Sequence, residues 1–497
     1  MTWALVACCA LATVPAGLRW LRVAQREHYL APAVTRFAVR WWAGGPVDLL
    51  LFVLSVVGVI GSLWSPWPGF LVVLAQIGPL GLGLRGRTSP LAWTGRLRRL
   101  AVLLGVMALA TFLVGGLTGS ALLVVSGLFL LPGLFDLALL VLVPVEKRMG
   151  GRWVDQAAAR LRSSGAKVVA ITGSYGKTTT KQYVAHLLSG SYRTVASPAS
   201  FNNRMGLARA INEQLVAGTE VFIAEMGTYG SGEISELCEW LPPSVSAIVA
   251  IGPVHLERFR SEERIVSAKA EILDGAGVGV IAIDHPLLAA LAVERGRLME
   301  VITVSGHGAE ARVTVRDGSL HIDGVDVARL PPDVFEVNLA VAVGIGLALG
   351  LNVSSIIGRL DDLPRAEHRQ TVTRSDRGFS IIDDTFNSNP AGARAGLERL
   401  SRVGAGGRLA VVTPGMVELG PRQFYENRSL AAAASVVVDD LVIVGRTNRR
   451  ALLEGSVSGK ASVTVVASRE DAVAWARQNL GPGDAVLYEN DLPDHYP

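Results

Sequence analysis

Cysteine is scarce in this chain, which holds only Cys8, Cys9 and Cys238 among its 497 residues. These three lack the paired spacing of zinc ligands, and Cys238 is far from the other two in sequence. Neither a disulfide framework nor a zinc site is therefore suggested, and the composition fits a reducing compartment. The chain also lacks internal repeats and low-complexity linkers, and its length predicts about two to four domains.

Acidic residues are scarce at the front of the chain. Residues 1–150 contain four Asp and Glu against 12 Lys and Arg, whereas the remainder contains 39 against 35. A basic front joined to an acidic back argues against a nucleic-acid partner, which requires positive charge along a folded groove. Half of the residues are hydrophobic and the mean hydropathy is +0.38, which is high for a soluble enzyme.

The hydrophobic residues are concentrated in long runs within residues 1–150. A membrane span needs about 20 apolar residues, with some tolerance for tilt. Five runs come close to this length, the first of them weakly apolar, and they predict an α-helical transmembrane region of five spans. The runs are 3–18, 47–64, 69–84, 100–118 and 121–145.

The charges between the runs predict an orientation. Arginines gather in 17–46, in 85–99 and after the last run, whereas the turns 65–68 and 119–120 carry none. Because Lys and Arg collect on the cytoplasmic side, we expect the N-terminus outside and the chain after the last run in the cytoplasm, anchored in the inner membrane. A cleaved signal peptide is the alternative for 1–18, but it would carry its positive charge before the apolar run.

One acidic residue, Asp136, lies within the fifth run. A carboxylate in mid-bilayer costs about 2.5–3.5 kcal/mol on insertion scales, so Asp136 is expected to face protein or a polar ligand. A position near the membrane interface, without a role, is the alternative.

A phosphate-binding loop follows the apolar front. The β-branched run 168–171 leads into Gly173, Ser174 and Gly176, and Lys177, Thr178 and Thr179 open a helix. Glycine lets the backbone approach a triphosphate, and the first N–H groups of the helix point at it. Lys177 is expected to reach the β- and γ-phosphates, and the Thr178 hydroxyl to bind Mg²⁺. Ile171 stands where longer versions of this loop have glycine, so this is the shorter G-x-x-G-K-T form.

Short strands and amphipathic helices alternate after residue 150, as in a nucleotide-binding α/β sheet. Glu225 ends one buried strand and His255 follows another. Ligands of open parallel sheets gather at the carboxyl ends of strands, so Glu225 is well placed for a metal. Each is a weak signal alone, since such residues are often helix caps or plain surface. Lys269 lies in a helical pattern and would by default be solvated.

A second, smaller doubly wound unit begins near residue 370. Its first strand ends in Asp384, and Asn387 follows. The predicted architecture is thus a transmembrane region over 1–150, a P-loop ATPase domain over 151–370 and a Rossmann-like domain over 371–497.

With these residues in view, the chain after about 152 resembles the Mur ligase family of ATP-dependent amide-bond ligases. Seven short motifs carry the resemblance in family order over some 265 residues. They are 173–181 (GSYGKTTTK), 201–206 (FNNRMG), 225–227 with 232–234 (EMG, GEI), 255–259 (HLERF), 268–271 (AKAE), 384–390 (DTFNSNP) and 416–420 (MVELG).

The resemblance implies a mechanism and roles for residues. ATP would phosphorylate a substrate carboxylate, and an amine would attack the acyl phosphate. Lys177 would neutralise the transferring phosphoryl group, and Thr178 and Glu225 would hold one Mg²⁺. His255 would contribute to a second metal site, with Lys269 supporting it as a carbamate. Three further residues would bind nucleotide or lie at the domain hinge: Asp384, Asn387 and Arg369.

The chain also departs from the family. The N-terminal domain that binds a UDP-sugar is missing, Val334 and Ala208 replace a histidine and a proline, and Glu489-Asn490-Asp491 replaces a Lys-Gly-Ser motif. The sequence therefore predicts a membrane-anchored carboxylate–amine ligase for a small-molecule or lipid-linked envelope precursor. A poly-γ-glutamate-synthase-like polymer ligase, and a transport or sensing protein with a nucleotide switch, are the alternatives.

Overall fold

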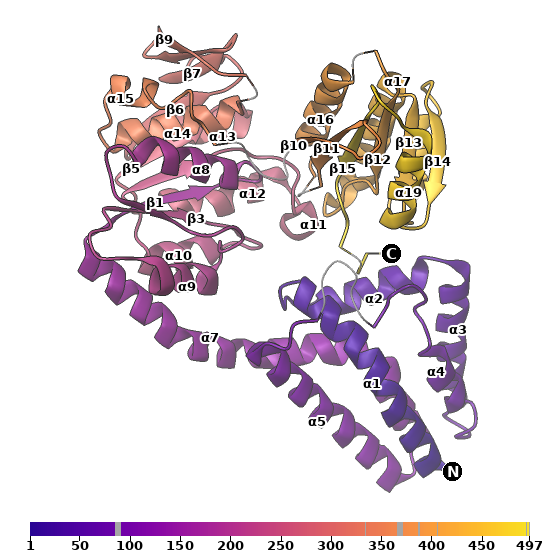
Figure 1. The fold of residues 1–497 in the computed structure, drawn as a ribbon. Coiled ribbons are helices and arrows are strands. Elements are labelled where there is room, and N and C mark those ends of the chain that lie inside the picture. The colour runs from indigo at the N-terminus through magenta and orange to yellow at the C-terminus, as the bar shows by residue number, and fades with distance from the viewer. Residues whose placement is uncertain are drawn as a thin grey trace.

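A computed structural model describes residues 1–84, 91–332, 334–364, 371–385, 388–404, 406–493 and 495–496. The chain forms a helical region followed by two α/β units, each built on its own sheet (Figure 1). One long helix joins the helical region to the first unit, and the C-terminus returns to the helical region.

Apolar composition and Gly or Pro breaks define the N-terminal helices. Thr94 caps helix α5 through a hydrogen bond from Leu97 N, and Gly119 ends it in the left-handed conformation. The helices are α1 (Thr2–Arg26), α2 (Ala33–Ala43), α3 (Pro46–Gly61), α4 (Gly69–Ala75), α5 (Gly95–Thr118), α6 (Ala121–Phe129) and α7 (Leu131–Ser164).

The structure corrects the prediction of five spans. Within the described residues, α1 and α5 are long and apolar enough to cross a membrane. The number rises to four only if the bent pairs α2–α3 (113°) and α6–α7 (70°) each count as one span. The run 69–84 fails because α4 has seven residues, about 10 Å of helix. Beyond Ala75 the run contains Pro79 and three glycines, which disfavour helix.

Asp136 faces protein, as expected from its cost in a bilayer. Its two carboxylate oxygens accept hydrogen bonds from Val34 N (3.2 Å) and Thr35 N (2.8 Å), in the first turn of α2. These N–H groups have no partner within their own helix. Asp136 of α7 therefore caps α2, which ties the two helices together.

The first α/β unit has a nine-stranded sheet of order β2-β3-β1-β4-β5-β6-β7-β8-β9. It is parallel from β2 to β7 and antiparallel from β7 to β9. Its strands are β1 (Lys167–Thr172), β2 (Thr194–Ala196), β3 (Val221–Glu225), β4 (Val245–Ile248), β5 (Val278–Ala282), β6 (Glu300–Ser305), β7 (Val313–Arg316), β8 (Ser319–Ile322) and β9 (Val325–Arg329). Its helices are α8 (Lys177–Leu188), α9 (Arg204–Gln214), α10 (Glu233–Trp240), α11 (Leu256–Phe259), α12 (Glu262–Ala270), α13 (Pro286–Arg295), α14 (Glu336–Ala348) and α15 (Val353–Ile357).

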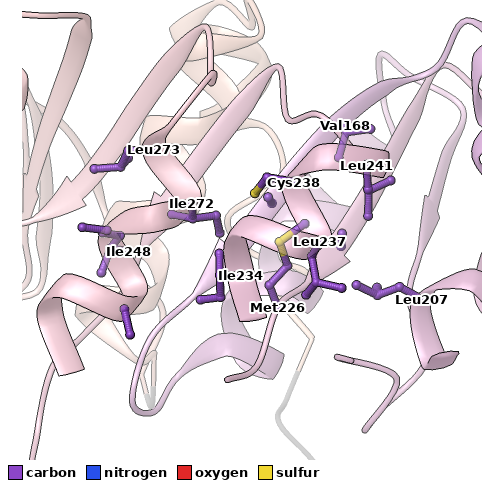
Figure 2. Packing of buried hydrophobic residues seen from close by; sticks show 14 of the residues in the cluster. Val168, Leu207, Met226, Ile234, Leu237, Cys238, Leu241, Ile248, Ile272 and Leu273 are labelled. Carbon is purple, nitrogen blue, oxygen red and sulfur yellow. The ribbon is translucent and has the colours of Figure 1, made fainter. Parts of the chain in front are cut away.

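Two hydrophobic cores cover the two faces of this sheet. Along β1, Val168 and Ala170 enter one core and Val169 and Ile171 the other, because successive strand residues point to opposite faces. Figure 2 shows the first core, where Cys238 packs among aliphatic side chains. The end of α7 contributes Val154, Ala157 and Leu161 to this core.

The second unit has a six-stranded sheet of order β10-β11-β15-β12-β13-β14, parallel except for β10. Its strands are β10 (Thr371–Arg374), β11 (Ser380–Asp384), β12 (Leu409–Thr413), β13 (Asp440–Val444), β14 (Ser462–Val466) and β15 (Ala485–Glu489). Its helices are α16 (Pro390–Val403), α17 (Gln423–Val437), α18 (Arg449–Ser456) and α19 (Arg469–Asn479).

The tail after β15 docks on α2 (Figure 1). Trp41 Nε1 donates to His495 O (2.8 Å), and the Phe37 ring lies edge-on to Tyr496 at 4.9 Å. The C-terminal unit is therefore attached to the helical region by its own last residues.

Candidate nucleotide and ligation site

The predicted phosphate loop lies between β1 and α8. Gly173 has no room for a side chain, since a Cβ there would lie 3.0 Å from Tyr175 O and 3.2 Å from Ala250 N. Gly176 adopts φ +82, a conformation that favours glycine. The bare backbone therefore leaves its N–H groups open to an anion at the start of α8.

Neighbouring segments hold the loop in shape. Ser174 Oγ donates to Gly252 O (3.2 Å) and accepts from Gly252 N (3.1 Å). Asn338 Nδ2 donates to Gly176 O (2.8 Å) and to Thr180 Oγ1 (2.9 Å). Thr179 is buried in the first turn of α8. The loop is thus fixed before any ligand arrives, which lowers the entropic cost of binding.

Lys177 and the pair Thr178–Glu225 lie at this loop. Lys177 Nζ donates to Gly173 O (2.8 Å), and Thr178 Oγ1 donates to Glu225 Oε2 (3.0 Å). Lys181 Nζ donates to the same carboxylate oxygen at 3.0 Å. Burial raises the pKa of Glu225, but Lys181, Lys177 and these hydrogen bonds outweigh it, so the net pKa is lowered and the carboxylate is anionic.

These residues fit ATP and Mg²⁺. A hydroxyl and an anionic carboxylate 3.0 Å apart are hard oxygen ligands of the type that Mg²⁺ takes beside nucleotide phosphates. The loop supplies the phosphate cradle and Lys177 the positive charge. Within the described residues no group of three or more His, Cys, Asp and Glu side chains gathers as a metal site, so Mg²⁺ here would rely on the nucleotide and water for its other ligands.

His255, the residue before helix α11, is held by residues from other segments. Its Nδ1 contacts Glu418 Oε2, and its ring lies edge-on to Tyr229 at 5.1 Å. Burial raises the pKa of Glu418, but the hydrogen bond from His255 and nearby positive charges lower it to about 2. His255 thus has a carboxylate partner from the C-terminal unit, and the second metal site predicted for it stays a prediction.

Lys269 is buried, contrary to the default expectation of a solvated helix lysine. Its side chain lies in α12 with 4% exposed surface. Burial, followed by the charge of Lys177, lowers its pKa well below the ordinary value. A lowered pKa favours the neutral amine, which is the form that reacts with carbon dioxide.

In the C-terminal unit, Asp384 ends β11 in register with Glu489 at the end of β15. Glu489 accepts hydrogen bonds from Ser388 Oγ and from Thr413 Oγ1 (2.5 Å for the latter). Burial raises the pKa of Glu489, the two hydrogen bonds lower it, and the charge of Asp384 raises it further. The net pKa is about 7. The predicted nucleotide contacts Asn387 and Arg369 lie outside the described residues.

Comparison with known proteins agrees with this geometry. The Mur ligase middle domain matches residues 171–344, and the Mur ligase glutamate ligase domain matches 368–488. The UDP-N-acetylmuramoyl-tripeptide–D-alanyl-D-alanine ligase of Mycobacterium tuberculosis is 31% identical over 377 residues, which cover 66% of this chain and 71% of that protein. The chain belongs to the Mur ligase family. It is therefore an ATP-dependent amide-bond-forming ligase, as its sequence motifs predicted.

Relatives in other bacteria bear the same name. The Bacillus subtilis ligase is 26% identical over 342 residues, covering 67% of this chain and 75% of its own. Among solved structures, one of MurF from Acinetobacter baumannii has a TM-score of 0.60 at 25% identity, covering 69% and 78% of the two chains. MurF from Thermotoga maritima in complex with ADP has a TM-score of 0.57 at 25% identity, covering 69% and 80%.

Three residues that complete the site carried no assigned role in the sequence prediction. Lys181 belongs to the loop motif and binds Glu225, and Glu418 belongs to the MVELG motif and binds His255. Asn338 could have been found as an amide within an otherwise apolar helix, because a buried polar side chain needs partners.

Lys177→Ala is expected to abolish ATP-dependent turnover while the protein folds and inserts normally. The ammonium group donates to Gly173 O at the loop, and its loss would remove positive charge from the place where the phosphates are expected to bind. Phosphate release by purified full-length protein measures this. Lys167→Ala, an exposed lysine of β1, is the matched control and should retain wild-type turnover. Retained turnover in Lys177→Ala would remove the loop from the mechanism.

Glu489 is expected to make stability depend on pH. A carboxyl whose pKa rises from 4.5 to about 7 on folding binds its proton more tightly in the folded chain. Its contribution is thus fully present below about pH 4.5 and is lost as the pH rises through about 7. Glu489→Gln should remove this part of the pH dependence in denaturant unfolding, whereas the exposed control Glu454→Gln should keep it. An identical pH profile for Glu489→Gln and wild type contradicts the assignment.

Proposed function

We propose that this protein is a membrane-anchored, ATP- and Mg²⁺-dependent ligase that joins a carboxylate to an amine on a cell-envelope precursor, including a lipid-linked one. The observation that carries the proposal is the combination of a complete Mur-type phosphate loop with an apolar helical region in the place of a UDP-sugar-binding domain. The catalytic units lie in the cytoplasm, at the inner membrane.

The surface of the helical region supports the membrane assignment. Large apolar side chains are exposed along α1 and α5, with Leu11 at 74%, Val102 at 67% and Leu117 at 77% exposed surface. Contiguous apolar surface of this kind marks an interface with lipid or protein. The length of α5, 24 residues or about 36 Å, is enough for a bilayer core of about 30 Å.

A continuous helix joins the helical region to the unit that holds the phosphate loop. Helix α7 runs for 34 residues from an apolar first half into the core of the first α/β unit. Since β1 and the phosphate loop follow α7 directly, one helix tethers the loop to the proposed membrane region. A substrate embedded in the bilayer can then be reached without a separate binding domain.

The chemistry follows from the residues at the loop. The substrate carboxylate attacks the γ-phosphorus of ATP, ADP leaves, and the amine nitrogen then attacks the acyl carbon and expels phosphate. Lys177 stabilises the transferring charge, and the loop backbone orients the phosphates. Mg²⁺, when bound by Thr178 and Glu225, supplies additional positive charge at the phosphates.

Lys269 is proposed to act as a carbamate. Its buried amine, in the neutral form that the lowered pKa favours, can add carbon dioxide and release a proton, which converts it into an anion that interacts with the charge of Lys177. The anion restores charge balance in a buried setting, where an isolated charge is costly.

A transport or sensing role has less support. Asp48 and Asp136 are the acidic residues within the predicted spans, and each has a structural task. Asp48 Oδ1 accepts from Leu80 N (2.7 Å), and Asp136 caps α2. Carboxylates on an ion pathway would instead face a polar cavity.

The identity of the acceptor is tested by substrate-dependent phosphate release from purified full-length protein. Lipid-linked peptide precursor is expected to drive release and free glutamate to drive none. Phosphate release driven by glutamate, and increasing with the length of an added glutamate chain, would favour the polymer ligase. Release with neither, in protein that binds ATP, would contradict a ligase acting on these precursors.

Lys269 is tested with labelled bicarbonate. A carbamate resonance in the ¹³C spectrum of the wild-type protein, lost in Lys269→Met, is the expected result. Methionine keeps the volume of the buried side chain and removes the amine. Turnover should fall in Lys269→Met, which lacks the resonance. Wild-type protein that shows full turnover but no carbamate resonance would contradict the assignment.

A further inference from the structure

The segment that carries His255 has an unusual backbone. Helix α11 spans only Leu256–Phe259, and the residues on either side of it, His255 (φ 61) and Arg260 (φ 69), are both left-handed. Neither is a glycine, and side chains disfavour this region of conformational space. Such a conformation persists where surrounding contacts hold it, so the contacts of α11 identify what fixes His255.

Three ion pairs join α11 to the N-terminal helical region. Glu257 contacts Arg40 Nη2 directly, and its other oxygen lies 3.7 Å from Arg36 Nη1. Arg258 Nη2 donates to Glu27 Oε2 at 3.1 Å, and the side chains of Arg258 and Glu27 are only 12% and 6% exposed. Removing one partner of a buried pair leaves the other charge uncompensated, so contacts of this kind define a position.

A stack of rings makes a second connection. His28, in the turn after α1, stacks on Tyr229 with ring centroids 4.9 Å apart, and the Tyr229 hydroxyl lies 3.0 Å from His28 Nε2. Tyr229 in turn lies edge-on to His255 at 5.1 Å. The guanidinium of Arg258 lies over the Tyr229 ring at 4.7 Å. One ring therefore separates a residue of the helical region from His255.

The C-terminal unit holds the opposite side. Glu418 contacts His255 through its carboxylate and accepts from Glu257 N at 3.4 Å through its backbone oxygen. Glu27 also accepts from His495 Nε2 at 3.0 Å. Helix α11 is thus held between the helical region and the C-terminal unit.

We infer that the helical region is part of the ligation site, with Glu27, His28 and Arg40 as positioning residues that act on His255 through Arg258, Tyr229 and Glu257. The inference rests on the proposed function for its effect on turnover. A region that served only as an anchor would need no buried ion pair and no ring stack against the segment of His255. The turn after α1 and helix α2 therefore set the geometry of the reacting end of the site.

The first test is hydrogen exchange of residues 255–260 in full-length protein. Arg40→Ala and His28→Ala should each speed exchange of these amides by about tenfold, since both loosen α11. Arg40→Lys, which keeps the charge, and His28→Phe, which keeps the ring, should stay close to wild type. Arg99→Ala, which breaks the Arg99–Glu146 pair inside the helical region, is the matched control and should change nothing. Wild-type exchange in both alanine variants overturns the inference.

The second test measures turnover in the same proteins with membrane extract as the source of acceptor. The alanine variants should lose about tenfold in kcat with KM for ATP unchanged, because a misplaced group slows the chemical step without weakening nucleotide binding. The Lys and Phe variants should recover turnover. Faster exchange with unchanged kcat overturns the positioning role. If wild-type protein releases no phosphate, the proposed function fails, and the exchange measurement still decides whether the helical region holds α11.

Discussion

A single buried carboxylate, Glu27, binds residues from all three parts of the chain. Its oxygens contact Arg258 of the first α/β unit (3.1 Å), His495 of the C-terminal tail (3.0 Å) and Arg36 of α2 (3.8 Å). With 5% exposed surface, Glu27 is largely withdrawn from water. A buried carboxylate needs partners that compensate its charge, so the three parts are placed by the requirement to satisfy one group.

This arrangement distributes the site over the whole molecule. The phosphate loop is fixed within the first unit by Asn338 and Ser174, independently of the other parts. His255, by contrast, depends on Glu418 from the C-terminal unit and on the ring stack that begins at His28. The phosphate loop and the segment of His255 thus rest on different contacts, and only the second set includes residues of the helical region.

Sequence reasoning reached the parts of the site that local patterns encode. The loop, the Thr178–Glu225 pair and the β-strands around them follow from periodicity and from glycine positions, because parallel strands bring their carboxyl ends to one edge. The pairing of His255 with Glu418 joins residues 163 positions apart, which no local pattern reveals. The five predicted spans failed for a related reason: hydropathy measures composition, whereas the end of α4 and the bends at 113° and 70° depend on glycine, proline and packing.

If the apolar helices take the place of a sugar-binding domain and enter a membrane, the enzyme must recognise its acceptor differently. If the acceptor is lipid-linked, the bilayer confines it to the plane in which the ligase sits, and its effective concentration at the site is high without a large binding surface. Affinity for a carrier nucleotide then has no role, while orientation of the reacting carboxylate still does. The contacts of Glu27, His28 and Arg40 with the first α/β unit and with α11 meet that remaining need. Helices that insert in the membrane and also hold α11 would couple the depth of the substrate in the bilayer to the position of His255.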